Sequence, residues 1–235
     1  MTAPSPNRGA LAAVAHALGP LRDRFVLVGG QAAELLITDP AAVRIRPTDD
    51  VDAIVSATTR VTYHRLADEL RARNFREDMR EGAPLCRWRH GNDLTLDVMP
   101  LAEDVLGFTN QWYGYAFTTA RTIQLEPGLT IRVVTAPAFL ATKWAAFDSR
   151  GHADHIGSHD VEDIVTVVAG RPELVDELSA EPPHVRDWLA SRTAQFLAHP
   201  DSADAIEGAL PDARQDPGIL RIVRRRFDSI AAMRT

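Results

Sequence analysis

Short apolar runs separated by polar turns predict alternating strands and helices in the first half of the chain. The run Phe25–Val28 is typical of a buried strand, and Val51–Val55 is typical of a second one. Leu66 and Leu70, four residues apart, give an apolar face to a helix expected over residues 63–73. Two further helices are expected in this half, at residues 11–18 and 31–37.

Two pairs of alternating segments predict hairpins. Residues 85–89 and 94–98 alternate apolar and polar positions around a polar, glycine-containing turn at 90–93. Residues 116–125 and 129–134 are joined across Glu-Pro-Gly, which predicts a second hairpin or a strand pair leading to another lobe.

From residue 136 onward the pattern changes to a helical one. Helices are expected at residues 137–148, 160–169, 172–178, 184–198 and 218–233. We therefore predict an α/β (α+β) fold, with a mixed β-sheet flanked by helices over residues 1–135 and a helical C-terminal domain over residues 136–235.

Composition limits the class of protein. The chain has 235 residues, of which 45% are apolar and 25% charged, as in ordinary globular domains. The single cysteine, Cys86, excludes an internal disulfide framework. The first residues lack the basic and then apolar pattern of a signal peptide, and no apolar run approaches the roughly 20 residues needed to cross a bilayer. We expect a soluble, cytoplasmic protein with no membrane partner.

The charge is mildly acidic, with a formal net value of −6. This argues against a dominant sequence-independent grip on nucleic acid, although a local basic groove is compatible with it. The basic residues are 25 arginines and one lysine, which makes Lys143 a residue of interest.

The segment before and within the second strand carries the candidate chemistry. Side chains alternate along a strand, so Asp50 and Asp52 project to one side while Val51 and Ala53 face the other. Two ionised carboxylates on an apolar strand repel each other unless a cation lies between them. The pattern therefore predicts a divalent metal site.

A third carboxylate is expected from the strand at 94–98, where Asp97 shares a face with Thr95. Three carboxylates on adjacent strands can hold Mg²⁺, with Mn²⁺ as the alternative ion, and so orient a triphosphate for attack by a hydroxyl. The other interpretation is a set of solvated aspartates at strand ends. We interpret Asp49 and Asp93 as turn residues.

Gly29 and Gly30 follow the first strand and open a helix. Glycine lets a phosphate approach the backbone at a helix N-terminus, where free N–H groups favour anions. The pair alone is weak evidence, because many strands end in a glycine turn. It gains meaning from the acidic strand that begins about 20 residues later.

Together these motifs resemble the nucleotidyltransferase superfamily with the DNA polymerase β-type fold, and specifically its AbiEii/AbiGii (MenT-like) toxin branch. The resemblance spans residues 25–170 and includes the segment from Arg46 to Asp52, the later Asp97, and the stretch from Lys143 to Asp163. The chain departs from that branch in two places. His159 stands where the branch has arginine, and residues 148–158 form a longer insertion containing histidine and glycine.

The resemblance implies a role for each matching residue. It implies that Asp50, Asp52 and Asp97 bind the metal and that Asp163 organises the site around Lys143, so that all five are catalytic. The nucleotide contacts that it implies come from Gly29, Gly30, Thr48, Lys143, Arg150 and Asp160. It also implies an NTP as donor, a tRNA 3′ end or other RNA as acceptor, and a cognate antitoxin as partner.

The C-terminal motif also has a purely structural interpretation. In that interpretation, Asp160 is the N-cap of a helix, Asp163 lies on the surface, and Lys143 is a solvated lysine. In the intervening loop, His152, Asp154 and His155 with His159 invite a zinc interpretation. A substrate-contacting loop or a plain surface loop explains the same residues.

Two basic clusters and one aromatic cluster complete the candidates. The clusters consist of Arg71, Arg73, Arg76, Arg80, Arg87 and Arg89; of Arg221, Arg224, Arg225 and Arg226; and of Trp112, Tyr113 and Tyr115. The arginines are interpreted as RNA-backbone contacts or, more simply, as solvated faces. The aromatic residues are interpreted as a base-stacking surface or as core.

The sequence thus predicts a Mg²⁺-dependent enzyme that moves a nucleoside monophosphate from an NTP to a hydroxyl acceptor and releases pyrophosphate. The acceptor is RNA, a protein or a small molecule. Two other classes remain: a catalytically silent binding module with the same fold, and a zinc hydrolase built on the histidine loop.

Overall fold

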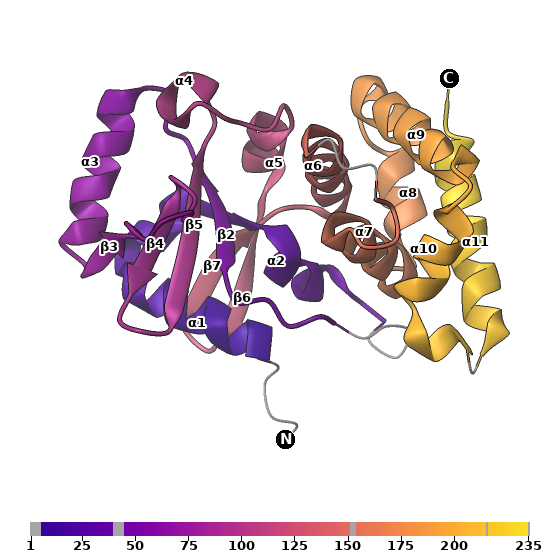
Figure 1. The fold of residues 1–235 in the computed structure, drawn as a ribbon, viewed down its shortest axis with the longest axis horizontal. Coiled ribbons are helices and arrows are strands. Elements are labelled where there is room, and N and C mark those ends of the chain that lie inside the picture. The colour runs from indigo at the N-terminus through magenta and orange to yellow at the C-terminus, as the bar shows by residue number, and fades with distance from the viewer. Residues whose placement is uncertain (1–5, 40–44, 151–153, 215, 235) are drawn as a thin grey trace. The chain divides into compact units, whose positions relative to one another are not determined.

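The computed structural model describes residues 6–39, 45–150, 154–214 and 216–234, and the chain forms two compact units (Figure 1). Unit 1 comprises Met1–Leu35 and Pro47–Thr135, and unit 2 comprises Leu36–Arg46 and Ala136–Thr235. The segment 36–46, which the sequence analysis placed in the N-terminal domain, thus belongs to unit 2.

Unit 1 is built on a seven-stranded mixed sheet with strand order β3-β4-β5-β2-β1-β7-β6. The strands are β1 (Phe25–Val28), β2 (Val51–Val55), β3 (Phe75–Glu77), β4 (Arg87–His90), β5 (Leu94–Pro100), β6 (Arg121–Glu126) and β7 (Leu129–Val133). Two neighbouring pairs, β1–β7 and β2–β5, are parallel, and the others are antiparallel. This confirms the predicted fold class, a mixed β-sheet with flanking helices.

The helices of unit 1 cover this sheet. They are α1 (Pro6–Leu18), the short 3₁₀ helix η1 (Gly19–Arg24), α2 (Gly29–Leu36), α3 (Arg60–Arg71), α4 (Glu103–Leu106) and α5 (Tyr113–Thr119). Helix α3 begins at a capping box in which Thr59 and Thr62 satisfy each other's backbone N–H groups. Its buried face contains Tyr63, Leu66 and Leu70, as the leucine spacing predicts.

One predicted strand is wrong over part of its length. Residues 116–119, expected to extend, form the end of α5, and the strand begins only at Arg121. Trp112 and Ala116 are buried four residues apart, so this segment has the period of a helix with one apolar face. The hydroxyls of Thr118 and Thr119 bond back to carbonyls of the preceding turn.

Unit 2 consists of helices and the segment 36–46. Its helices are α6 (Ala136–Ser149), α7 (His159–Gly170), α8 (Leu174–Ser179), α9 (Pro183–Ala198), α10 (Ser202–Gly208), the 3₁₀ helix η3 (Pro211–Arg214) and α11 (Pro217–Ala231). Fully buried aromatic residues from three of these helices, Trp144, Phe196 and Phe227, form the centre of its core.

Helix α7 is held at both ends. Ser158 is its N-cap and accepts a hydrogen bond from the backbone N–H of Val161. At the other end, Thr38 N–H and Asp39 N–H donate to the Gly170 carbonyl at 2.9 Å, and Arg226 donates to the Val168 carbonyl at 2.8 Å. The bonds at this second end satisfy carbonyls that a helix C-terminus leaves open.

Within the described residues, each helix is too short or too polar to traverse a lipid bilayer.

Candidate functional site

The acidic residues of unit 1 lie on neighbouring strands. Strands β2 and β5 are parallel, and their register places Asp52 directly beside Asp97. Adjacent strands are about 4.8 Å apart and share their pleat, so both side chains project from the same face of the sheet. Asp50 precedes β2 by one residue and lies two positions before Asp52.

An arginine lies among these carboxylates. Arg87 on β4 is the antiparallel register partner of Asp97 and binds both of its oxygens, with Nε to Oδ1 and Nη2 to Oδ2 each at 2.8 Å. The same Nη2 lies 2.6 Å from Oδ2 of Asp50. These hydrogen bonds and the charges of Asp97 and Asp50 raise the pKa of Arg87 further above its usual value.

Asp50 and Asp97 therefore converge, and the cation between them is a guanidinium. The donor chemistry suits Mg²⁺ or Mn²⁺, because hard divalent ions prefer carboxylate oxygens. As arranged, however, the described residues contain no set of three His, Cys, Asp or Glu side chains placed to hold a metal ion. A metal would fit only after Arg87 releases at least one carboxylate.

Gly29 adjoins this cluster and tolerates no side chain. Its φ is +70°, and an added Cβ would lie 2.7 Å from Cβ of Asp52 and overlap the carboxylate as well. Val28 and Asp52 are register partners on β1 and β2, which explains the close approach. The glycine thus lets the Asp52 carboxylate lie against the start of α2.

Thr48 is fixed by its backbone and has an unused hydroxyl. Its N–H donates to Asn7 at 3.1 Å, and its carbonyl accepts from Gln31 at 3.1 Å. Oγ1 of Thr48 and Oε1 of Gln31 are buried and have no hydrogen-bond partner among the described residues. Such groups are costly unless a ligand or water satisfies them, so this part of unit 1 is suited to binding a polar ligand.

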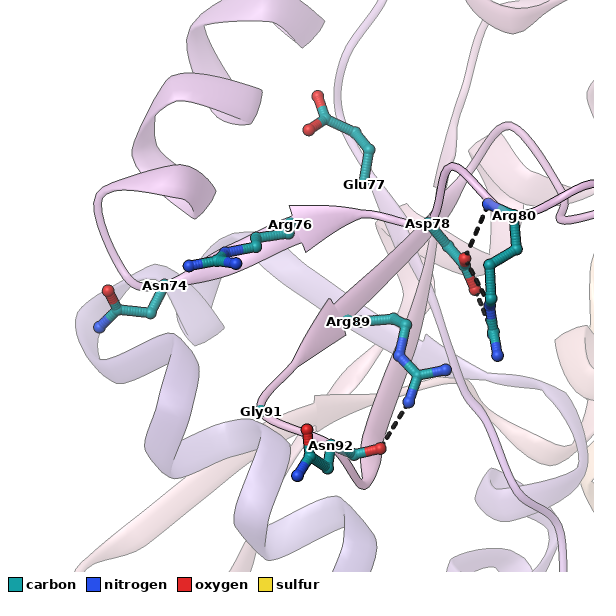
Figure 2. A pocket seen from close by; sticks show the side chains of 8 residues that line it. All are labelled: Asn74, Arg76, Glu77, Asp78, Arg80, Arg89, Gly91 and Asn92. Carbon is teal, nitrogen blue, oxygen red and sulfur yellow. Dashed lines mark hydrogen bonds and ion pairs between the residues drawn. The ribbon is translucent and has the colours of Figure 1, made fainter.

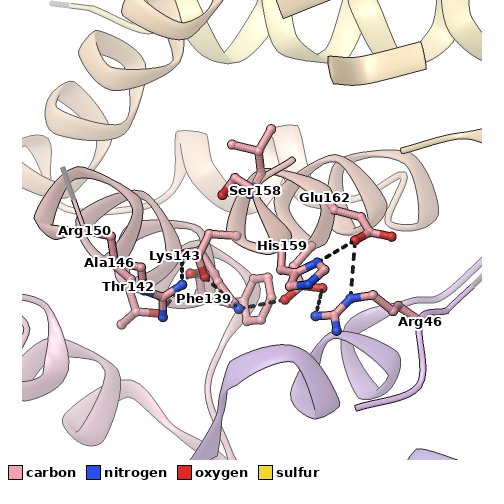
Figure 3. Close-up of polar contacts among 12 residues, drawn as sticks. Arg46, Phe139, Thr142, Lys143, Ala146, Arg150, Ser158, His159 and Glu162 are labelled. Carbon is pink, nitrogen blue, oxygen red and sulfur yellow. Dashed lines mark hydrogen bonds and ion pairs between the residues drawn. The ribbon is translucent and has the colours of Figure 1, made fainter. Parts of the chain in front are cut away.

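The predicted residues of unit 2 form their own cluster (Figure 3). Lys143 on α6 lies with its Nζ 3.1 Å from Asp160 and 2.6 Å from Asp163, both on α7. Asp160 and Asp163 are 2% and 5% exposed. The sole lysine therefore neutralises two buried carboxylates, which would otherwise be strongly unfavourable.

Two arginines flank this lysine. Nη1 of Arg150 lies 2.5 Å from Asp160, and Arg46 lies 3.6 Å from Asp163 and 3.3 Å from Glu162. Arg46 comes from the segment 36–46, which is why the sequence motif that begins at Arg46 contributes to both units.

These contacts decide two structural interpretations of the motif. Ser158, rather than Asp160, caps α7, and Asp163 is buried rather than on the surface. The side chain of Lys143 is 12% exposed, so it is not a solvated lysine.

The histidine loop is described only in part, because His152 lies outside the described residues. Asp154 accepts hydrogen bonds from the N–H groups of Ile156 and Gly157 and so forms a turn. His155 is buried, and its ring stacks on His199 with 3.9 Å between centroids. The part that is described thus places His155 in an aromatic cluster of unit 2.

Members of the two arginine clusters and of the aromatic cluster make structural contacts. Arg71 pairs with Glu77 and lies over the Trp88 ring, and Arg226 bonds to carbonyls at the end of α7. Trp112 is buried and contacts Tyr115 edge to face, which agrees with the interpretation as core.

Sequence reasoning missed Arg87 and Arg46 as members of these clusters. Arg87 lies opposite Asp97 because the turn of the hairpin has three residues, 91–93, whereas the predicted turn at 90–93 places Arg87 opposite Leu96. Arg46 begins the sequence motif, but nothing in the sequence indicated its partners Glu162 and Asp163, which are more than 100 residues away in the chain.

Comparisons with known proteins give a limited result. No family model matches the chain, and no curated protein matches it. Among solved structures, a similar one is the crystal structure of an antigenic nucleotidyltransferase-like protein from Paracoccidioides brasiliensis. It has 17% sequence identity and a TM-score of 0.47, over 93% of this chain and 92% of that chain.

Proposed function

We propose that this chain is a nucleotidyltransferase that moves a nucleoside monophosphate from an NTP to a hydroxyl acceptor. The observation that carries the proposal is the convergence of Asp50 and Asp97 on one guanidinium nitrogen, with Asp52 beside Asp97 in register. Clustered carboxylates beside a glycine at a helix start are suited to a metal–triphosphate complex.

In the proposed reaction, the acceptor oxygen attacks the α-phosphorus and forms a new P–O bond. The bond from the α-phosphorus to the pyrophosphate oxygen breaks, and the hydroxyl proton passes to water or to a carboxylate of the cluster. When bound, Mg²⁺ or Mn²⁺ would supply charge neutralisation for the triphosphate and a lower pKa for the attacking hydroxyl.

The residues of the chain have separable tasks in this proposal. Asp50, Asp52 and Asp97 would hold the metal. The free N–H groups at the start of α2, where Gly29 and Gly30 lie, would bind the triphosphate, and the unused hydroxyl of Thr48 would donate to a phosphate or ribose oxygen. Following the resemblance, Lys143, which is held by Asp160 and Asp163, and Arg150 are proposed as phosphate ligands.

We further propose RNA, in particular a tRNA 3′ end, as the acceptor, and a toxin role restrained by a cognate antitoxin. Both follow from the resemblance of the motifs to the AbiEii/AbiGii toxin branch.

The deciding experiment incubates the protein with each α-labelled NTP and Mg²⁺ or Mn²⁺, in the presence of total RNA, total protein or small hydroxyl acceptors. Asp52→Asn is expected to lower label transfer by roughly a thousandfold, because metal charge stabilisation is worth several kcal/mol. Asp49→Asn is the matched control, since Asp49 is exposed and has no part in the cluster. Equal transfer by both variants would refute the assignment.

One observation favours a second candidate, a catalytically silent binding module. Arg87 already neutralises Asp50 and Asp97, as a structural ion pair would. This candidate predicts nucleotide binding without turnover, or no binding. Calorimetric titration of NTP, with and without metal, beside the transfer assay distinguishes the two candidates.

A further inference from the structure

A pocket of about 520 Å³ in unit 1 lies at the edge strand β3 and the turn between β4 and β5 (Figure 2). Its lining is rich in guanidinium and amide groups. The lining residues are Asn74, Arg76, Glu77, Asp78, Arg80, Arg89, Gly91 and Asn92.

Two of these arginines lie on adjacent strands as cross-strand neighbours. Arg76 on β3 and Arg89 on β4 are direct partners in the antiparallel register, so their side chains lie on the same face of the sheet. Like charges in this position destabilise a strand pair. Their neighbours Phe75 and Trp88 point to the other face and are buried, so each arginine is held on the pocket side.

The carboxylates of the pocket form their direct ion pairs with other arginines. Glu77 forms an ion pair with Arg71, and Asp78 binds Arg80 through both oxygens, at 2.8 and 2.5 Å. Arg89 donates to the backbone carbonyl of Asn92 at 2.5 Å. Among the described residues, no carboxylate lies within ion-pair distance of Arg76 or Arg89, so the pocket keeps a positive excess.

We propose that this pocket binds the phosphate group of a phosphate ester, with Arg76 and Arg89 as its principal ligands. The planar guanidinium fork matches phosphate oxygens, and a bound anion offsets the repulsion between the two positive charges. The amides of Asn74 and Asn92 add donors at the rim. The volume exceeds that of one phosphate and suits a nucleotide or a short stretch of phosphodiester chain. The proposal is independent of any catalytic activity.

The test measures direct binding of two probes to the full chain. Pyrophosphate is titrated by calorimetry, and a fluorescein-labelled single-stranded RNA oligonucleotide is titrated by anisotropy. The variant Arg76→Gln/Arg89→Gln is compared with Arg65→Gln/Arg121→Gln, which removes the same charge from exposed positions of unit 1 outside the pocket. We expect the pocket variant to bind at least roughly tenfold more weakly, because each lost charge-assisted hydrogen bond is worth about tenfold. The control variant should lose much less.

The probes also identify the source of the phosphate. Binding of the oligonucleotide alone supports a phosphodiester chain, and binding of pyrophosphate supports a small phosphate compound. Equal losses in the two double variants, or no binding of either probe to the unmodified protein, would overturn the proposal.

Misfolding is checked by thermal unfolding. The pocket variant should be at least as stable as the unmodified protein in phosphate-free buffer, because the like-charge pair is gone. In metal-free buffer, added pyrophosphate should raise the Tm of the unmodified protein more than that of the pocket variant. A Tm shift of equal size in the pocket variant would also contradict the proposal.

Discussion

Gly29 is the residue whose replacement should affect the acidic cluster most directly. An alanine there adopts a left-handed φ of +70° and overlaps Asp52. We expect Gly29→Ala to lower the free energy of unfolding by roughly 3 kcal/mol, of which about 1 to 2 is the backbone cost. Urea unfolding measures this change.

Gly128→Ala provides the control for that backbone cost. Gly128 has φ +81°, yet an added Cβ would have nothing within 4 Å. The decrease in the free energy of unfolding caused by Gly128→Ala should therefore consist of the backbone cost alone. If the two substitutions cost the same, Asp52 does not lie against Gly29.

Arg87 gives a second prediction at the scale of one residue. In Arg87→Met, Asp50 and Asp97 lose their shared cation and repel each other, so the metal-free variant should be less stable by roughly 2 to 4 kcal/mol. The freed carboxylates should bind Mn²⁺ more tightly than in the unmodified protein. Electron paramagnetic resonance of free Mn²⁺ measures that affinity.

Arg121→Met serves as its comparison, because Arg121 is exposed at the start of β6. It should change neither stability nor Mn²⁺ affinity. Mn²⁺ affinity that is unaltered by Arg87→Met would mean that the guanidinium does not compete with metal.

The carboxylates of unit 1 could be predicted at this scale because strand alternation is local. The side of the strand to which Asp50 and Asp52 project follows from their neighbours in the chain alone. The contact of Arg87 with Asp97 depends on hairpin register, which the turn at Gly91 sets, with φ +61°. The expected turn began one residue too early, at His90, which in the structure is the last residue of β4 and pairs with Leu94.

At the scale of elements, the pair α6 and α7 depends on one lysine. Lys143→Met leaves Asp160 and Asp163 buried with weaker partners, and should destabilise the two helices by roughly 3 kcal/mol. Arg150→Met should cost less than about 1 kcal/mol, since the Arg150 side chain is 61% exposed and its ion pair is screened. Amide hydrogen exchange in α6 and α7 measures the destabilisation caused by each substitution. A larger destabilisation by Arg150→Met than by Lys143→Met would mean that Arg150 is the principal partner of Asp160.

Elements with strong local patterns were predicted well. Strands β1 and β2 have the predicted limits, because a continuous apolar run bounded by polar residues identifies a buried strand. Helix α5 was assigned in part to a strand, since its threonine and aromatic residues favour extended structure, and the burial of Trp112 and Ala116 overrides that preference. Strand β3, with three residues, is too short for any alternation to be visible.

For the whole molecule, the single cysteine offers a probe of one unit. Cys86 is buried in unit 1, and its burial, with the charges of Asp97 and Asp52, raises the thiol pKa to about 12. Burial likewise raises the pKa of Tyr63, in the same unit, to about 12. Both groups should therefore remain protonated in the folded protein at pH values where the unfolded chain ionises.

This difference fixes the sign of the alkaline response. The ordinary pKa values are 9.0 for the thiol and 10.0 for the phenol, so between about pH 9 and 12 the folded state holds more protons than the unfolded one. Their contribution to stability is complete below pH 9 and is lost as the pH rises through 12. Unit 1 should lose stability over this range, and Cys86→Ala should reduce the loss.

Thiol labelling with Ellman's reagent at pH 8 measures the opening of unit 1. The native protein should react far more slowly than the urea-unfolded chain, because the reagent attacks the exposed thiolate. Because Cys86 is the only cysteine of the chain and lies in unit 1, the whole signal reports on that unit. If the native protein is labelled as fast as the unfolded chain, Cys86 is accessible and its thiol pKa is not raised. Labelling that becomes faster at a lower urea concentration than loss of the unit 2 helices would show that the two units unfold separately.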